Sequence, residues 1–251
     1  MRQVIEEKLK EIEKKEKVTI LMAAEAGSRA WGFASPDSDY DVRFIYVRLR
    51  EDYLKLEGQR DVIEWQLDQT LDINGWDVQK ALRLLMKSNP TIFEWCASPI
   101  LYRSSEAFLR FKELANDCFS VKKTTHHYYN MARANYQNYL KGQQVHLKKY
   151  FYVLRPILAA RWALDQKTTP PVPFDQLVET QLEPYLIPAV ERLLEQKKNT
   201  PEMGTSASIG ELNTYIEEQL RRIEEQLTSL TDDENRDWGG LNRFFLDLLD
   251  V

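Results

Sequence analysis

The chain has 251 residues, of which 43% are hydrophobic, and a formal net charge of −5 at pH 7. This length allows one large domain or two small ones, and the apolar content is enough for a real core. The acidic balance excludes a protein that coats nucleic acid through a basic surface, but it is compatible with a local basic groove.

Neither a secretory nor a membrane-spanning segment is visible. The first 17 residues are too charged for a signal peptide, and no apolar run approaches the about 18 residues of a membrane span. Cys96 and Cys118 lack metal-ligand spacing, so two small buried thiols in a reducing compartment are the simplest interpretation. We therefore expect a cytoplasmic protein with no membrane partner.

The chain begins with a charged amphipathic segment. Residues 2–16 have the helical period, and their apolar stripe consists of Ile5, Leu9 and Ile12. Residues 18–24, VTILMAA, then predict a buried strand. That strand leads into Gly27 and Ser28, where a bare backbone and a hydroxyl could approach a phosphate.

Two carboxylates follow on a second strand. Asp39 and Asp41 are two residues apart, so they share one face of the strand predicted to continue to residue 47. Two carboxylates on one face repel each other, and a divalent ion relieves that repulsion. Mg²⁺ prefers a few carboxylates together with phosphate oxygens. A phosphate loop followed by paired carboxylates indicates nucleotide chemistry.

The next segment mixes a strand and two helices. Residues 61–67 alternate as a strand does. Asn74 looks like a helix N-cap with Asp77 in the capping-box position, which predicts a helix from about residue 76 to 87. Asn89 and Pro90 then end this helix and start a short one through Trp95.

Beyond residue 104 the strand signals stop and helical periodicity takes over. Helices are predicted over residues 104–119, 121–141, 146–166, 183–198, 208–229 and 239–249. Proline-rich and polar stretches at 167–174 and 199–208 predict loops. The pattern favours an α+β catalytic domain, residues 1–104, followed by an all-helical domain, residues 105–251.

The stretch GSRAWGFASPDSDYDVRFIY, residues 27–46, resembles the DNA polymerase β-type nucleotidyltransferase superfamily. The signature of that superfamily is a Gly-Ser pair, a short loop and Asp-x-Asp on a strand. Residues 71–102 and 148–162 are similar to the bacterial YcgL-like group, the RNA-repair-pathway polymerase β family. The resemblance implies a small mixed sheet with flanking helices, and substrate held between it and a helical domain.

The resemblance also implies roles for the carboxylates. Asp39 and Asp41 would bind Mg²⁺, with Mn²⁺ as an alternative, although the segment could by itself be an acidic turn. The family needs a third carboxylate on a neighbouring strand, for which Asp72 is the first choice. Asp68 and Glu64 are the competitors, and Asp77 has an ordinary explanation as a capping residue.

Residues that would contact the nucleotide come from both halves of the chain. Gly27 and Ser28 would hold the β- and γ-phosphates, and Arg29 would either add charge there or pair with a surface acid. In the helical half, a cluster with helical spacing could neutralise the triphosphate or be a solvated helix face. Its basic members are Lys148, Lys149 and Arg155.

Tyr129, Arg133 and Tyr136 share a face of the preceding helix. They could stack on bases, but helix–helix packing is the favoured explanation. The three histidines, His126, His127 and His146, lack a metal-binding pattern and are expected at the surface or in caps.

The sequence thus predicts a metal-dependent nucleotidyltransferase that uses an NTP. By resemblance to the RNA-repair group, an RNA 3′ end is the favoured acceptor. A protein or small-molecule acceptor is the second hypothesis. A non-catalytic nucleotide- or partner-binding module, such as a toxin-neutralising protein, is the third. The oligomeric state is left open.

Overall fold

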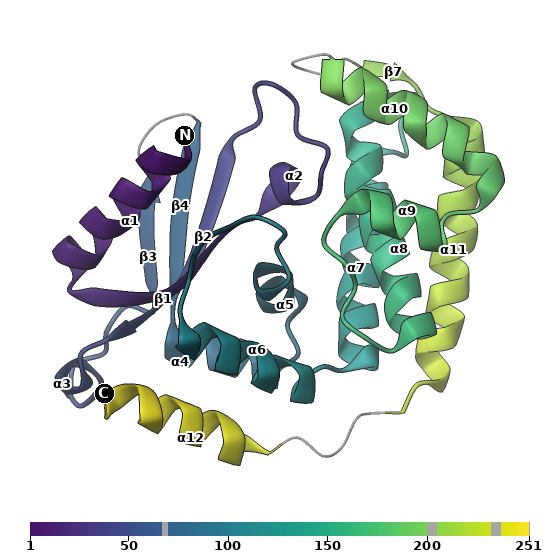
Figure 1. Ribbon diagram of the computed structural model, residues 1–251. Coiled ribbons are helices and arrows are strands. Elements are labelled where there is room, and N and C mark those ends of the chain that lie inside the picture. The colour runs from purple at the N-terminus through teal and green to yellow at the C-terminus, as the bar shows by residue number, and fades with distance from the viewer. Residues whose placement is uncertain (67–69, 200–204, 232–236, 251) are drawn as a thin grey trace. The chain divides into compact units, whose positions relative to one another are not determined.

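The structure is a computed structural model that describes residues 1–66, 70–199, 205–231 and 237–250 (Figure 1). The chain forms two compact units. We call the first the sheet unit; it comprises Met1–Ala30, Asp39–Cys118 and Asn235–Val251. We call the second the helical unit; it comprises Trp31–Ser38 and Phe119–Glu234.

The sheet unit is built on five strands in the order β3-β4-β2-β1-β5. The strands are β1 (Val18–Glu25), β2 (Tyr40–Arg48), β3 (Val62–Gln66), β4 (Leu71–Asp77) and β5 (Leu101–Ser104). Strands β2 and β4 run parallel, whereas β1 pairs antiparallel with β2 and β5, and β3 pairs antiparallel with β4. This mixed sheet with its helices confirms the predicted α+β class.

Helices cover both faces of the sheet. On one face, α1 (Arg2–Glu16) buries its predicted stripe against a cluster that includes Val42, Phe44 and Tyr46 of β2. On the other face, Trp76 of β4 stacks on Trp95 of α5 (Pro90–Cys96), with ring centroids 3.8 Å apart. Because strand side chains alternate, Asp41 and Arg43 point away from the α1 face.

The remaining helices of the sheet unit come from distant parts of the chain. They are α2 (Gly27–Ala30), α3 (Arg50–Tyr53), α4 (Val78–Met86), α6 (Glu106–Asp117) and α12 (Trp238–Leu249). Helix α12 lies beside α6 (Figure 1), where Phe244 meets Phe111 at 5.9 Å between ring centroids. Phe245 makes an edge contact with Tyr53 at 5.1 Å.

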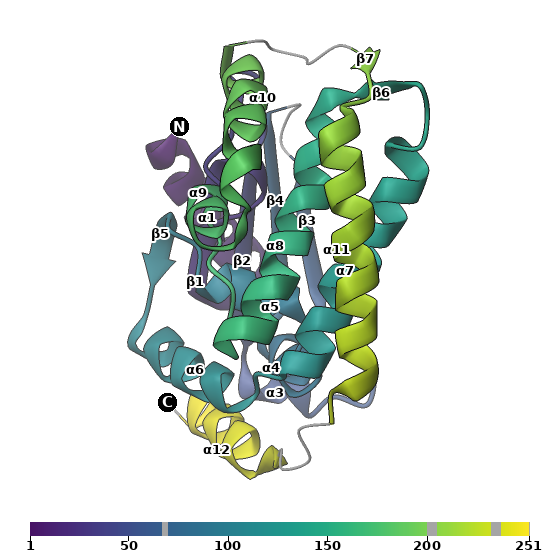
Figure 2. The same cartoon turned by 90° about the vertical axis from the view of Figure 1, so that its right-hand side faces the viewer.

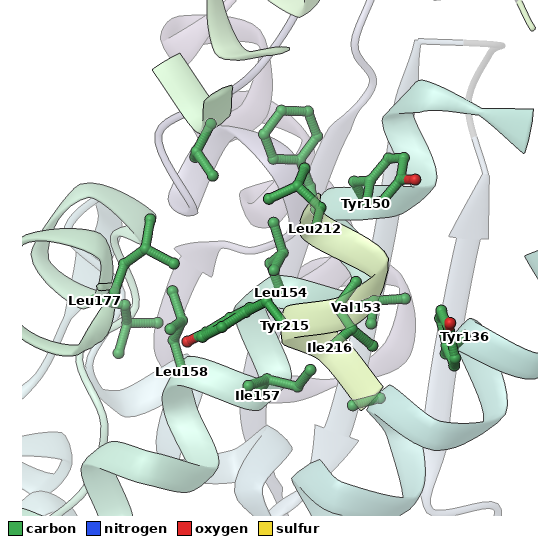
Figure 3. Close-up of a cluster of buried hydrophobic side chains, with 14 of the residues drawn as sticks. Tyr136, Tyr150, Val153, Leu154, Ile157, Leu158, Leu177, Leu212, Tyr215 and Ile216 are labelled. Atoms are coloured by element: carbon green, nitrogen blue, oxygen red, sulfur yellow. The ribbon is translucent and has the colours of Figure 1, made fainter. Parts of the chain in front are cut away.

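The helical unit packs around one apolar core. Its helices are α7 (Val121–Tyr139), η1 (Leu147–Tyr150), α8 (Phe151–Gln166), α9 (Phe174–Gln181), η2 (Pro184–Leu186), α10 (Ile187–Asn199) and α11 (Gly210–Ser229). Helices α7, α8 and α11 lie side by side (Figures 1 and 2). Between them, Leu154, Ile157, Tyr215 and Ile216 are fully or almost fully buried (Figure 3).

The structure corrects the predicted start of the first internal helix. Residues 71–77 form β4, so Asn74 is a strand residue and Asp77 itself caps α4, accepting the N–H of Gln79 at 2.8 Å. Pairing with β2 on one side and β3 on the other outweighs the local capping pattern. Gly75 fits this strand because a Cβ there would lie 2.2 Å from the Phe44 ring.

Two smaller features also differ from the predictions. The chain forms strands beyond residue 104, where the sequence predicted only helices and loops. Strand β6 (Gln144–His146) pairs with β7 (Thr205–Ala207) in a two-stranded sheet. Helix α9 begins at Phe174, directly after the proline-rich loop, and was not predicted.

The compact units do not coincide with the two domains expected from the sequence. Helices α6 and α12 belong to the sheet unit, and Trp31–Ser38 belongs to the helical unit. The physical reasons are the aromatic contacts of α12 described above and those of residues 31–38 described below. Independent folding of either part stays a prediction.

Candidate functional site

Asp41 and Asp72 lie opposite each other on the parallel strands β2 and β4. Their Cα atoms are paired in the register of the two strands. The guanidinium of Arg43 lies between them, and its Nη2 donates to Asp41 Oδ1 and to Asp72 Oδ2, each at 2.8 Å. The structure therefore brings together the second motif carboxylate and the residue predicted as the third.

Asp41 is the most electrostatically perturbed carboxylate of this group. Burial raises its pKa, the neighbouring Arg43 lowers it, and the charges of Asp72 and Asp39 raise it further. A half-buried carboxylate with two acidic neighbours favours a bound cation. Asp39 is exposed just before β2, and its backbone carbonyl accepts a hydrogen bond from Arg29 Nε at 3.1 Å.

Gly27 lies directly against the carboxylate of Asp41. Its φ is +58°, a left-handed conformation that favours glycine. A Cβ at this position would lie 2.0 Å from Asp41 Oδ2. The Ala26 N–H donates to the Asp41 carbonyl at 2.8 Å, which fixes the chain just before the Gly-Ser pair. Ser28 follows, half-buried, in the single turn α2.

Glu25 is a site residue that the sequence reasoning missed. It ends β1, is buried, and accepts the backbone N–H of Asp41 at 2.8 Å. The Tyr102 hydroxyl donates to its other oxygen. Burial is the main cause of its raised pKa. A glutamate at the end of an otherwise apolar strand was the available signal.

Arg29 contacts residues at the start of β2. Its guanidinium lies 3.7 Å from the centroid of the Tyr40 ring, a cation–π geometry. Together with the bond to the Asp39 carbonyl, this contact holds Arg29 beside the start of β2.

The loop between Gly27-Ser28 and Asp39 is anchored inside the helical unit. Phe33 is buried, stacks on Phe151 at 5.0 Å and meets Phe174 edge-on at 5.6 Å. The Phe174 N–H donates to the carbonyl of Trp31 at 2.9 Å. Asp37 lies in the exposed turn of this loop.

Arg155 also belongs to this anchor. It is only 3% exposed, and its guanidinium lies 4.5 Å from the centroid of the Trp31 ring. Its Nη2 donates to the carbonyl of Val172 at 3.4 Å. Arg155 thus holds the loop in place, and its predicted contact with the triphosphate stays a prediction.

The two lysines of the predicted cluster lie on η1. Lys149 Nζ is 4.0 Å from the centroid of the Tyr139 ring. The side chain of Lys197 lies near them. Burial lowers the pKa of this lysine, the charge of Asp37 raises it, and the charge of Lys148 lowers it further. The Nζ atom of Lys197 lies 5.6 Å from the centroid of the Phe33 ring. Sequence reasoning missed Lys197, and no local signal marked it.

The aromatic face of α7 packs against α11 instead of lying open. Tyr129 and Tyr136 are buried, and the Tyr136 hydroxyl donates to Glu217 at 2.7 Å. Arg133 is exposed beside them. Helix–helix packing accounts for both tyrosines, whereas Arg133 remains accessible to a ligand.

The competitors for the third carboxylate are placed less favourably. Glu64 is exposed and pairs with Arg60, and Asp77 is buried as the cap of α4. Asp68 lies outside the described residues. His126 and His146 are exposed, His127 is half-buried, and both cysteines are buried.

The carboxylates at the start of the inner strands β2 and β4 suit a divalent cation. Asp39, Asp41 and Asp72 offer hard oxygen ligands, and the missing side chain at Gly27 leaves Asp41 Oδ2 approachable. Within the described ranges, no three His, Cys, Asp or Glu side chains already converge as a metal cluster. Arg43 lies where two of the carboxylates would meet such an ion.

Comparison with known proteins identifies the family. Residues 1–247 match the profile of the RNA repair pathway DNA polymerase beta family. The chain belongs to this family. It is also 44% identical over 254 residues to the uncharacterized protein YcgL of Bacillus subtilis (strain 168), covering 100% of this chain and 97% of that protein. Membership places the chain among the polymerase β-like nucleotidyltransferases, as the sequence motif indicated.

A search of solved structures finds a nucleotidyltransferase-like protein from Exiguobacterium sibiricum 255-15. The match covers 98% of this chain and 80% of that one, at 13% identity and a TM-score of 0.32. A likeness this distant carries no weight for mechanism.

Among the described residues, no helix is long and apolar enough to cross a membrane.

Proposed function

We propose that this protein is a metal-dependent nucleotidyltransferase that transfers NMP from an NTP to an acceptor hydroxyl, with an RNA 3′ end as the acceptor. Family membership supports the general chemistry. The single observation that carries the proposal is the pairing of Asp41 with Asp72 across parallel strands, next to Gly27.

In this proposal Asp39 and Asp41 hold the divalent ion, and Asp72 completes its ligands. Once bound, Mg²⁺ or Mn²⁺ neutralises charge on the phosphates and makes the acceptor hydroxyl more acidic. Asp72 accepts the hydroxyl proton. The acceptor oxygen bonds to the α-phosphorus as the bond to the β-phosphate oxygen breaks, and pyrophosphate leaves.

Other residues bind and orient the nucleotide. The backbone at Gly27 and the hydroxyl of Ser28 contact the phosphate chain, and Arg29 contributes positive charge beside Asp39. Lys148 and Lys149 are the proposed cations for the triphosphate from the helical unit. Arg133 is the proposed contact for the acceptor strand, because it is exposed on α7.

The test is label transfer from each α-labelled NTP to RNA with a free or a blocked 3′ hydroxyl. We expect labelling only of the free end, and none with Asp41→Asn. Equal labelling of both RNAs, or labelling of protein or small molecules alone, would overturn the RNA-end acceptor and leave the transfer chemistry standing. No labelling of any fraction would favour a nucleotide-binding module.

The role of Asp72 can be separated from nucleotide binding. Asp72→Ala should lower kcat strongly while leaving the nucleotide Kd within about twofold, because its carboxylate acts on the acceptor hydroxyl. Glu64→Ala is the matched control and should keep both values. The reverse result would assign the role to Glu64.

A further inference from the structure

Among the residues that the structure describes, Arg43 forms ion pairs with both Asp41 and Asp72. Both pairs use the same nitrogen, Nη2, at 2.8 Å from each carboxylate. Asp41 and Asp72 lie on neighbouring strands whose register sets their carboxylates close together. A single positive group therefore compensates two negative ones at the candidate metal position.

The other nitrogen of the guanidinium is held by the backbone. Arg43 Nη1 donates to the carbonyl of Val42 at 3.2 Å and to the carbonyl of Asp72 at 3.3 Å. These bonds do not use the carboxylates. The guanidinium can therefore release both side chains and still keep hydrogen-bond partners, which lowers the cost of the exchange.

The position of the three side chains makes exchange with an ion feasible. The Asp72 side chain is 50% exposed and the Asp41 side chain 31%, so a hydrated cation can reach both. A guanidinium and a divalent ion both seek carboxylate oxygens. The guanidinium and the ion compete for the same carboxylate oxygen atoms. Binding of one must therefore weaken binding of the other.

We propose that Arg43 is a positioning residue that acts as an internal counter-ion in the metal-free protein. It holds Asp41 and Asp72 in register and gives up their carboxylates when a divalent ion binds. This inference rests on the proposed function, because it takes Asp41 and Asp72 as metal ligands. It adds that metal affinity is set by competition within the protein.

The experiment compares Arg43→Gln with the wild-type chain and with Arg103→Gln. Arg103 is a matched control, since it is a similarly half-buried strand arginine with a single carboxylate partner, Glu13 at 2.6 Å. Mn²⁺ is titrated by electron paramagnetic resonance without nucleotide. Arg43→Gln should bind Mn²⁺ about threefold to tenfold more tightly, because the competing ion pairs are gone. Arg103→Gln should bind it as the wild type does.

Thermal unfolding provides a second measurement that needs no activity. In EDTA, Arg43→Gln should lower the Tm by about 2–4 °C, because two carboxylates lose their counter-ion. Saturating Mn²⁺ should remove this difference. Arg43→Lys, which keeps the charge, should recover most of the Tm in EDTA.

The outcomes separate the two proposals. Wild-type binding of Mn²⁺ with equal or weaker binding by Arg43→Gln would overturn the counter-ion role and leave the metal-dependent function intact. Absence of Mn²⁺ binding by the wild type, with and without NTP, would overturn the proposed function. Unchanged Tm of Arg43→Gln in EDTA would also contradict the counter-ion role.

Discussion

The guanidinium groups of half-buried Arg43 and buried Arg155 are stabilised by different kinds of partner. Arg43 in the sheet unit is neutralised by two carboxylates, each 2.8 Å away. Arg155 in the helical unit lies on the Trp31 ring and bonds to a backbone carbonyl. Arg43 has carboxylate partners, which are ligands for divalent cations, whereas the partners described for Arg155 are an uncharged ring and an uncharged carbonyl.

The two regions relate differently to the proposed chemistry. A carboxylate pair bridged by an arginine is already arranged for a cation and can exchange one for another. An arginine stacked on tryptophan in an aromatic cluster contributes to packing and gains little from a soluble ligand. We therefore expect variants near Arg43 to change metal use, and variants near Arg155 to change stability.

The largest effect expected on the Arg43 side is loss of turnover. Asp41→Asn should lower kcat at least about a thousandfold, which corresponds to about 4 kcal/mol of transition-state stabilisation. Asp39→Asn should act in the same direction. Asp37→Asn, in the exposed turn of the same segment, is the control and should keep near wild-type turnover. The measurement is steady-state pyrophosphate release.

Near-normal turnover of Asp41→Asn in Mg²⁺ would contradict the proposal that the carboxylates next to Arg43 bind the metal ion. Circular dichroism should show both aspartate variants folded, so that loss of activity is not loss of structure.

The prediction for the region around Arg155 can be tested by removing the ring of Phe33, which anchors the loop in the aromatic cluster. Phe33→Ala should lower the free energy of unfolding by about 3 kcal/mol, because a buried phenyl ring leaves a cavity. Chemical denaturation with near-ultraviolet detection measures this. Tyr185→Ala, an exposed aromatic residue of the same unit, is the control and should change stability by less than about 0.5 kcal/mol. Equal changes for both would mean that the anchor carries no packing energy.

A smaller effect sharpens the assignment of Arg155. Arg155→Lys should cost about 1 kcal/mol of stability, because lysine lacks the guanidinium group that lies over the Trp31 ring. The nucleotide Kd, measured by calorimetry, should stay unchanged. A tenfold weaker Kd would instead support the triphosphate contact predicted from the sequence. Lys149→Glu provides the comparison, since it should weaken nucleotide binding without a loss of stability.

The smallest effect concerns Glu25, the buried carboxylate behind Asp41. Its pKa is raised by burial, so the folded state binds its proton more tightly than the unfolded state does. Stability from this group therefore falls as pH rises from the ordinary glutamate pKa through the raised one. Glu25→Gln should lack this loss and be more stable at pH 7 by about 0.5–1 kcal/mol. Thermal melts at several pH values between 4 and 7 measure the difference between the two proteins.

A parallel pH dependence of wild type and Glu25→Gln would contradict this expectation. Tyr102→Phe is a useful companion, because it removes one hydrogen bond to Glu25 without removing the charge.

Local patterns were sufficient to predict most elements of the sheet unit. The stripe of Ile5, Leu9 and Ile12 is buried as expected, and β1, β2 and α5 lie where their sequences indicate. Asp41 and Asp72 could be chosen as partners because one motif and one family requirement pointed to them. Their roles stay predictions, but their adjacency is observed.

What could not be predicted depends on contacts between distant residues. Asn74 and Asp77 make a good local capping pattern, yet β4 is decided by pairing with β2 and β3. In the sequence, Arg43 is one more polar residue of a predicted strand. Its role becomes visible only in the structure, where Asp72 lies opposite Asp41. Trp31 and Phe33 read as a loop between two motif halves, and only the aromatic cluster with Phe151 shows where that loop is held.

Helix α12 has a consequence for how the protein is made. The sheet unit contains both α1 and α12, and the main segment of the helical unit lies between them in the chain. During synthesis, domains fold as their residues emerge from the ribosome. The five strands that bear the carboxylates all lie before residue 105, so they can pair early. Phe111 and Tyr53 can make their ring contacts with Phe244 and Phe245 only after the main segment of the helical unit has been synthesised.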